Sequence, residues 1–336
     1  RVRNFALHEV RVAPTFLFTA DFADIFEVRG VRRDRRGRFL PPETGPDEVV
    51  LGYMGLDGVR RRVRARFFPA PAEVSADRVR FEMMIPPKGE ESFTAVFSCE
   101  IEPARPAPVP YDAALHDVSS EIGRMRLGDA RVETANVHFN DLLDRSMTDL
   151  HIMITRTPQG PYPYAGIPWF STVFGRDGII TALQYLWVKP ELARGVLGFL
   201  ASCQATEDNP EQDAEPGKII HEMRRGEMAA LGEIPFGRYY GSVDATPLFV
   251  LLAGAYFEAT GDLGFVRTVW PNLVAALEWI ERYGDRDGDG FVEYGRRSSH
   301  GLTAQGWKDS HDSVFHEDGE LAEGPIALCE VQGYVY

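Results

Sequence analysis

The spacing of hydrophobic residues changes once along this 336-residue chain, and that change limits what the chain can fold into. Before residue 103, apolar residues form short runs or alternate with polar ones, which is the pattern of β-strands. After residue 110 they recur every three to four residues, which is the pattern of α-helices. The sequence therefore predicts a strand-rich part followed by a helical part.

The strand-rich part is expected to be an antiparallel, β-sandwich-like domain over residues 1–102. Turn residues separate several short apolar segments, as in sandwiches. Within residues 59–68, arginines alternate with apolar residues, so that one face is charged and the other is apolar. The strands are expected near residues 16–18, 21–28, 59–68, 78–84 and 92–101.

Four prolines between residues 103 and 110 indicate a linker, and residues 103–130 are taken as a linker with a connecting helix. The charge also changes here. Residues 1–110 carry 18 Lys and Arg against 16 Asp and Glu, whereas residues 111–336 carry 18 against 34. This asymmetry supports two different domains.

The helical part, residues 131–336, is expected to contribute to a fold that is mainly α. Six or seven helical patterns follow residue 111, and Pro190 and Pro271 are each expected to open a helix. Polar loops rich in aromatic residues separate alternate helices, at 158–176, 206–240 and 283–324. Loops of such length suggest function, and we expect them to gather on one face around a cleft.

Composition excludes several classes of protein. The net charge of −14 argues against nucleic acid as a partner, and no apolar run is long enough for a membrane span. The three cysteines are scattered, which favours reduced thiols in a cytoplasmic protein. The oligomeric state is left open.

One candidate binding segment is Trp169–Gly178. Trp169 and Phe170 offer aromatic faces to a sugar ring, while Arg176 and Asp177 offer fixed donors and acceptors to adjacent hydroxyls. The alternative is structural, with Asp177 capping the helix and pairing with its neighbour. Asp244 also precedes an apolar helix and could be a cap.

Two further segments concern metals. The segment H-E-M-R-R-G-E from residue 221 lacks the second histidine of a zinc protease, so that class is rejected. Asp285, Asp287 and Asp289 match the first half of a calcium loop, but position twelve is Arg296 instead of glutamate. No cofactor is expected, with calcium at this loop as an open alternative.

Trp307 and Asp309 form a candidate for acid catalysis, because an aromatic wall that excludes water keeps a carboxylic acid protonated. On spacing alone, Asp312 and Glu293 are nearly equal rivals. Further along the chain, Glu330 and Tyr334 are spaced to share one helix face.

Taken in order, these motifs resemble one family, the bacterial amylo-α-1,6-glucosidases or glycogen debranching enzyme-like proteins. The matching stretches are G-I-P-W-F-S-T-V-F-G-R-D-G, H-E-M-R-R-G-E, R-Y-Y-G-S-V-D-A-T-P, D-R-D-G-D-G-F-V-E-Y, Q-G-W-K-D-S-H-D-S and E-V-Q-G-Y. The segment A-D-F-A-D-I-F-E-V-R-G is similar to the sandwich domain that precedes the catalytic domain there.

The resemblance implies a partial (α/α)6 toroid of the glucoamylase and trehalase type and an inverting, exo-acting hydrolase of α-glucosidic bonds. It implies Asp309 as the general acid. The base is expected beyond Tyr336, since the chain looks truncated at both ends, and the fragment is expected to be inactive. The predicted substrate-binding residues are Trp169, Phe170, Arg176, Asp177, Tyr240, Asp244, Trp307, Lys308, Glu330 and Gln332.

The expected partner is an α-glucan or a small glucoside. Alternatives are a trehalase-like enzyme, a hydrolase of a glycosylated compatible solute, and a catalytically silent glycan-binding protein. A prenyl-transfer scaffold would need a metal or diphosphate site, for which the sequence offers no suitable cluster.

Overall fold

The structure is a computed structural model that describes residues 1–104, 106–107 and 109–336. Arg105 and Pro108, both within the predicted linker, lie outside the described residues. The chain divides into two compact units, residues 1–121 and 122–336.

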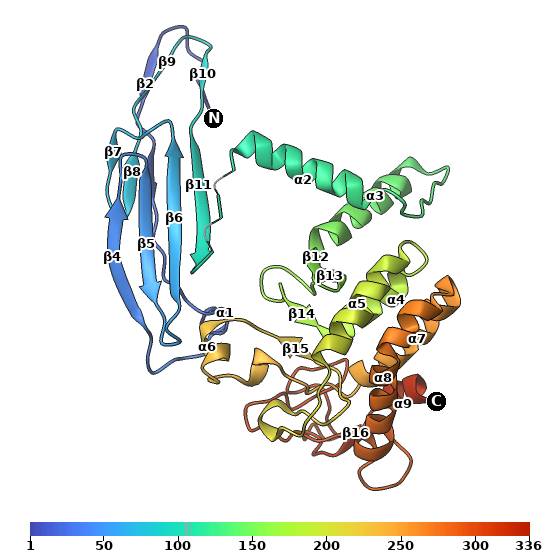
Figure 1. Ribbon diagram of the computed structural model, residues 1–336. Coiled ribbons are helices and arrows are strands. Elements are labelled where there is room, and N and C mark those ends of the chain that lie inside the picture. Colours follow the sequence, from blue (N-terminus) through green and yellow to red (C-terminus); the bar gives the residue numbers. More distant parts are fainter. Residues whose placement is uncertain (105, 108) are drawn as a thin grey trace. The chain divides into compact units, whose positions relative to one another are not determined.

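The first unit is built from antiparallel strands (Figure 1). Its largest sheet has four strands in the order β11-β6-β5-β4, and the smaller sheets are β1-β10, β2-β9 and β3-β8-β7. The bounds are β1 Val2–Arg3, β2 Val10–Val12, β3 Thr15–Leu17, β4 Arg38–Thr44, β5 Glu48–Met54, β6 Arg60–Phe68, β7 Glu73–Val74, β8 Arg78–Arg80, β9 Met83–Ile85, β10 Glu90–Glu91 and β11 Thr94–Ile101.

Two layers of these strands share one hydrophobic core. The four-stranded sheet contributes Val49, Ala65 and Phe67, and the segment of β8 and β9 contributes Val79 and Phe81, all at most 2% exposed. The alternation in β6 therefore buries its apolar face, as the sequence predicts. The opposite face carries the arginines, which pair with glutamates on β5 and β11, as Arg64 does with Glu48 and Glu100.

The prediction of a strand at residues 21–28 was wrong, because residues 21–24 are irregular and α1 spans Ile25–Val28. Asp24 and Glu27 form a reciprocal capping box, in which each side chain accepts a backbone N–H at the start of the helix. These local hydrogen bonds outweigh the strand preference of the β-branched and aromatic residues here.

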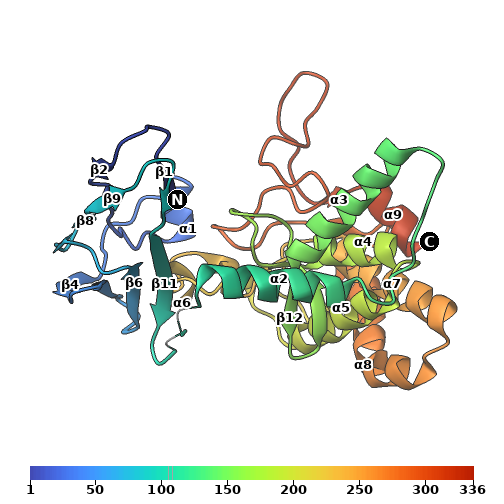
Figure 2. The same cartoon turned by 90° about the horizontal axis from the view of Figure 1, so that it is seen from above.

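The second unit holds a group of packed helices with short two-stranded sheets at its margins (Figures 1 and 2). α2 spans Tyr111–Met125 across the boundary between the units, and each of its residues is at least partly exposed. The other elements are α3 Val137–Met153, β12 Ile154–Thr157, β13 Gly160–Pro163, β14 Val173–Phe174, α4 Gly175–Tyr185, α5 Pro190–Cys203, the 3-10 helix η1 Pro210–Gln212, β15 Glu222–Met223, α6 Glu227–Ala230, the 3-10 helix η2 Pro235–Gly237, α7 Ala245–Thr260, α8 Leu263–Trp279, the π-helix η3 Ile280–Gly284, β16 Glu293–Tyr294, β17 Ile326–Ala327 and α9 Cys329–Val335.

Helices α4, α5, α7 and α8 lie side by side and bury the main core of this unit. Their apolar faces supply Ile179, Leu197, Phe249 and Leu273, all at most 6% exposed. Pro190 stands in the first turn of α5, as predicted, but Pro271 lies inside α8, so the prediction that it opens a helix was wrong.

The expected fold class, a mainly α protein with a partial (α/α)6 toroid, was also wrong. The chain is 35% helical and 22% strand, with several small sheets, and is therefore a mixed α/β structure. Short strand pairs such as β14-β15 and β16-β17 interrupt the helical unit, and long irregular segments replace further helices.

None of the described helices has the length and apolar character that a membrane crossing requires.

Candidate functional site

The candidate site is built where the first turn of α4 meets the first turn of α7. Strand β14 pairs with β15 and leads directly into α4, so the strand pair fixes the position of Arg176. Gly175 makes this approach possible, because a Cβ at this position would lie 2.0 Å from the carbonyl oxygen of Ile220. The ends of two helices are thereby held against each other.

Arg176 is the centre of the site and is 5% exposed. Its Nη1 donates to Asp244 Oδ2 at 3.0 Å and to the carbonyl oxygen of Gly306 at 2.6 Å, while its Nη2 donates to Asp309 Oδ2 at 2.8 Å. Its guanidinium carbon lies 5.7 Å from the ring centre of Trp307. One guanidinium thus joins segments that are more than 60 residues apart in the chain.

Asp244 occupies the N-cap position of α7, but its side chain makes no capping hydrogen bond. Its Oδ2 accepts from Arg176, and its Oδ1 accepts from the hydroxyl of Ser242 at 2.5 Å. The residue is 1% exposed. Asp244 therefore serves as the buried counter-ion of Arg176 and does not cap the helix, whose first N–H is accepted by Ser242 Oγ at 3.4 Å.

Asp177 lies beside this cluster, in the first turn of α4, and the N-cap position of that helix belongs to Phe174. Burial raises the pKa of Asp177, and the positive charge of Arg176 opposes the shift. The negative charges of Asp309 and Asp244 raise it further.

A second buried carboxylate positions the segment that carries Asp309. Asp213 Oδ1 accepts the backbone N–H groups of Arg297 and Ser298 at 2.6 and 3.0 Å. Its Oδ2 accepts the hydroxyl of Tyr239 at 2.7 Å and the amide of Gln305 at 3.1 Å. Asp213 therefore fixes the backbone at Arg297 and Ser298 and the side chain of Gln305, the residue just before the carbonyl group that Arg176 binds.

A groove of about 630 Å³ opens next to Trp307. Predicted residues Trp307, Lys308 and Glu330 line it, together with Tyr334 of α9. Burial raises the pKa of Tyr334, and the charges of Asp244 and Glu330 contribute, which brings this hydroxyl into the electrostatic field of the site. Trp307 thus lines the groove and also contacts the guanidinium of Arg176.

Four other predicted substrate-binding residues are not among those that line this groove. Trp169 and Phe170 are about 40% exposed on the segment before β14, where the Phe170 ring lies 5.8 Å from that of Phe174. Tyr240 is buried in the helical core and donates its hydroxyl to the carbonyl oxygen of Cys203 at 2.7 Å. The amide of Gln332 bonds to both backbone groups of Val292.

Sequence reasoning did not select Asp213, Gln305 or Ser242 for the site. Polar residues in irregular loops have no periodic pattern, so nothing in the sequence distinguishes Asp213 from the other acidic residues around it. Tyr334 could be found, because its spacing from Glu330 places both on one face of a helix.

His221 provides a pH-dependent prediction. It is 2% exposed between the rings of Phe174 and Tyr239, and its Nδ1 has no hydrogen-bond partner among the described residues. Burial, with the charges of Arg176 and Lys218, lowers the pKa of His221 to about 3. The imidazole therefore stays neutral in the fold, whereas the unfolded chain binds a proton near pH 6.5.

Because this folded-state pKa is depressed, its contribution to stability is present above about pH 6.5 and is lost as the pH falls toward the folded-state pKa. Because of this pKa difference, we expect the free energy of unfolding to fall by about 2 kcal/mol from pH 7 to pH 5. In urea titrations, His221→Gln should reduce the difference in the free energy of unfolding between pH 7 and pH 5 by that amount. The exposed His316 gives a matched control, His316→Gln, which should leave the difference unchanged.

Comparison with known proteins places one part of the chain. Residues 1–96 match the family model described as the N-terminal domain of some glycogen debranching enzymes. A search of curated proteins found no match. The matched segment lies in the strand-rich unit and points to a glycogen debranching enzyme-like protein, and hence to carbohydrate metabolism. The Arg176 cluster lies outside the matched residues.

Proposed function

We propose that this protein is a glycoside hydrolase that removes glucose units from α-glucosidic bonds, in the manner of an amylo-α-1,6-glucosidase. The observation that carries the proposal is the position of Arg176, which is held between Asp244 and Asp309 and lies beside the exposed ring of Trp307. The fixed fork of an arginine, acidic acceptors and an aromatic face together suit the hydroxyl groups and the apolar face of a glucose unit. The match of residues 1–96 supports the same substrate class.

In this proposal Asp309 is the general acid, which protonates the leaving oxygen as the glycosidic bond breaks. Inverting enzymes place a second carboxylate on the opposite side of the sugar, roughly 6.5–9.5 Å away, to activate water. In the structure, Asp309 Oδ2 accepts a hydrogen bond from Arg176 Nη2 at 2.8 Å, whereas a general acid must hold a proton when the glycosidic bond breaks. A glucose unit that takes over the hydrogen bond from Arg176 would release Asp309 to hold a proton.

The same contact favours a second candidate, a catalytically silent glycan-binding protein. Binding of a sugar by Arg176, Asp177 and Trp307 does not require Asp309 to hold a proton. The two functions differ in whether glucose is released.

The test is to follow the natural protein by proton NMR with α-1,6-branched dextrin, linear α-1,4-glucan, trehalose and small glucosides. We expect glucose from the branched substrate, with β-glucose appearing before its equilibration with the α-anomer. Early α-glucose would contradict inversion. Release of glucose only from trehalose or from a small glucoside would show that the substrate is not a branched glucan. Binding without any release of glucose would support the glycan-binding function.

A further inference from the structure

A separate pocket of about 280 Å³ lies among the loops of the helical unit. Its walls come from η1, from the segment between α6 and η2, and from residues 298–300, and none of its lining residues belongs to the groove beside Trp307. Small-ligand pockets span roughly 300–1,000 Å³, so this one suits a single ring-sized group. The polar side chains of its lining are those of Glu211, Gln212, Glu233, Ser298 and His300.

Ser298 supplies an independent observation that points to a polar ligand. It is 2% exposed, and its hydroxyl has no hydrogen-bond partner among the described residues. Its backbone groups are already used, because its N–H donates to Asp213 Oδ1 at 3.0 Å and its carbonyl oxygen accepts from the N–H of Gly301 at 3.2 Å. An unpaired buried hydroxyl is costly, and a ligand that exchanges a hydrogen bond with it would remove that cost.

The other polar side chains of the pocket suit the hydroxyl groups of a neutral molecule. Glu211, Glu233 and His300 are exposed, and Gln212 is half-buried. Carboxylates accept hydrogen bonds, whereas an amide both donates and accepts them. Among the described residues that line the pocket there is no lysine or arginine, so an anion would meet two carboxylates and no permanent positive charge.

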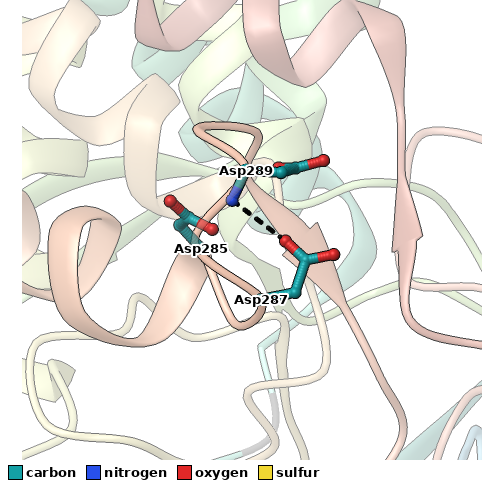
Figure 3. Close-up of side chains that lie close together, drawn as sticks. All are labelled: Asp285, Asp287 and Asp289. Carbon is teal, nitrogen blue, oxygen red and sulfur yellow. Dashed lines mark hydrogen bonds between the residues drawn. The ribbon is translucent and has the colours of Figure 1, made fainter.

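A metal ion is a poorer match for this pocket. In the part of the chain that the structure describes, the group of three or more acidic or histidine side chains close enough to share an ion is that of Asp285, Asp287 and Asp289 (Figure 3). Their carboxylate oxygens lie within 4.8 Å of one another on the loop before β16. The acidic residues and the histidine of the pocket do not form such a group, and they therefore serve better as hydrogen-bonding groups than as metal ligands.

The pocket is joined to the Arg176 cluster through Asp213. One oxygen of this buried carboxylate holds the backbone of Ser298, and the other accepts the side-chain amide of Gln305 at 3.1 Å. The carbonyl group of the residue that follows Gln305 accepts a hydrogen bond from Arg176. Asp213 thus fixes one wall of the pocket and also the segment that reaches Arg176.

We propose that this pocket binds a second glucose unit of the glucan, in addition to the unit held at the Arg176 cluster. The identity of the sugar rests on the proposed function, because the pocket itself specifies only a neutral ring with several hydroxyl groups. Ser298 Oγ would donate a hydrogen bond to one sugar hydroxyl, and Glu211 would accept one from another. Two points of contact on one chain raise the affinity for a glucan above that for a single glucose unit.

The probe is D-glucose, which has the size of one unit and no glycosidic bond to cleave. Its binding to the natural protein is followed by NMR of isotope-labelled alanine methyl groups. Ala229 lines the pocket, and Ala245 begins α7 next to Asp244, so these two methyl groups report on the two sites separately. We expect glucose to shift the Ala229 signal with a dissociation constant of about 10⁻³ to 10⁻² M.

Ser298→Ala should weaken the glucose affinity measured at Ala229 by about 3–10-fold, since it removes one hydrogen bond to the sugar. The same variant should raise Tm by about 1–3 °C, because it removes a buried hydroxyl that the chain leaves unpaired. Glu211→Gln, an exposed substitution of similar size, should weaken the affinity by at least about 3-fold. The control is Ser202→Ala, whose exposed residue donates its hydroxyl to the carbonyl oxygen of Phe199, and it should leave the affinity unchanged.

The pocket is rejected if glucose does not shift the Ala229 signal, or if the loss in Ser298→Ala is matched in Ser202→Ala. Unchanged affinity in Ser298→Ala rejects it as well, and Glu211→Gln decides the question if that variant does not fold. A glucose phosphate or glucosamine that binds at least about 10-fold more tightly than glucose would show that the ligand is an ion, which also overturns the proposal.

Failure of the pocket and failure of the proposed hydrolysis can be told apart. Glucose-dependent shifts at Ala245 without shifts at Ala229 would contradict the pocket and leave the proposed function intact. Shifts at Ala229 that depend on Ser298, in a protein that releases no glucose from any glucan, would support the pocket and contradict hydrolysis.

Discussion

An Asp309→Asn variant of the natural protein is expected to release glucose from α-glucan branches about 10²–10⁴-fold more slowly than the unaltered protein. The asparagine keeps the shape of the side chain but cannot deliver a proton to the leaving oxygen. An activated aryl glucoside needs little protonation to leave, so its turnover should fall much less. Turnover and substrate affinity are measured separately on both substrates.

Asp312→Asn is the matched control for this variant. Asp312 lies three residues further along the same irregular segment and is exposed, and its substitution should leave turnover within a few-fold of the original value. An equal loss on both substrates in Asp309→Asn would mean that Asp309 supports the site without transferring a proton. Unchanged turnover on the glucan would reject it as the acid.

The structure adds Asp177 as a rival, because burial raises its pKa and a raised pKa is what a proton donor needs. Glu293, the distal rival on spacing alone, is buried at the start of β16. Asp177→Asn therefore belongs in the same comparison. If that variant shows the leaving-group dependence and Asp309→Asn does not, the proton is held by Asp177.

Four of the residues that the sequence singles out lie together in the structure, whereas the predicted architecture around them was wrong. Arg176, Asp244, Trp307 and Asp309 were selected from three separate segments, and the structure joins them through one guanidinium. Short polar motifs can be seen in a sequence because they combine rare residue types. The sequence does not show whether a polar group faces a groove or the core. Tyr240 is an example, because its hydroxyl donates a hydrogen bond to a backbone carbonyl inside the helical core.

The errors in the fold have a common physical origin, which is that local hydrogen bonds and burial override periodicity. Asp262 accepts the backbone N–H of Phe265 and starts α8 at Leu263, eight residues before Pro271. The helix continues through the proline because residues on both sides of it, such as Val269 and Leu273, are buried. The lost backbone hydrogen bond costs less than exposure of that face.

The content of strand was underestimated for a related reason. Paired segments of two residues, such as β14 with β15, have no alternation that a sequence could display. They are nonetheless decisive for the site, because that pair fixes the first turn of α4. A helical pattern in the sequence indicates where the core is, but it does not show what lies between the helices.

Replacing Arg176 by Met is expected to lower the free energy of unfolding by about 3–5 kcal/mol. Methionine fills much of the space but leaves Asp244, whose side chain is 1% exposed, without its counter-ion. The hydrogen bonds to Gly306 and Asp309 are lost as well. Urea denaturation measures the loss, and Arg267→Met, an exposed arginine on α8, is the control that should change stability by less than about 0.5 kcal/mol.

The double variant Arg176→Met with Asp244→Asn separates the charge from the packing. If the cost of the single variant comes from an unpaired buried carboxylate, the double variant should lose less than the sum of the two single variants, by up to about 3 kcal/mol. Additive losses would mean that the two side chains do not stabilise each other, although they lie 3.0 Å apart.

Arg176→Lys then tests the role of the residue in binding sugar. Lysine keeps the positive charge near Asp244, so the loss of stability should be smaller than in Arg176→Met. It cannot reproduce the planar fork that reaches Asp244 and Asp309 at once, and the same fork is what adjacent sugar hydroxyls would use. A folded Arg176→Lys variant should therefore bind glucan fragments at least about 10-fold more weakly, since a charge-assisted hydrogen bond contributes about 1.5–3 kcal/mol. Full affinity in that variant would show that the guanidinium holds the loops together and does not contact the sugar.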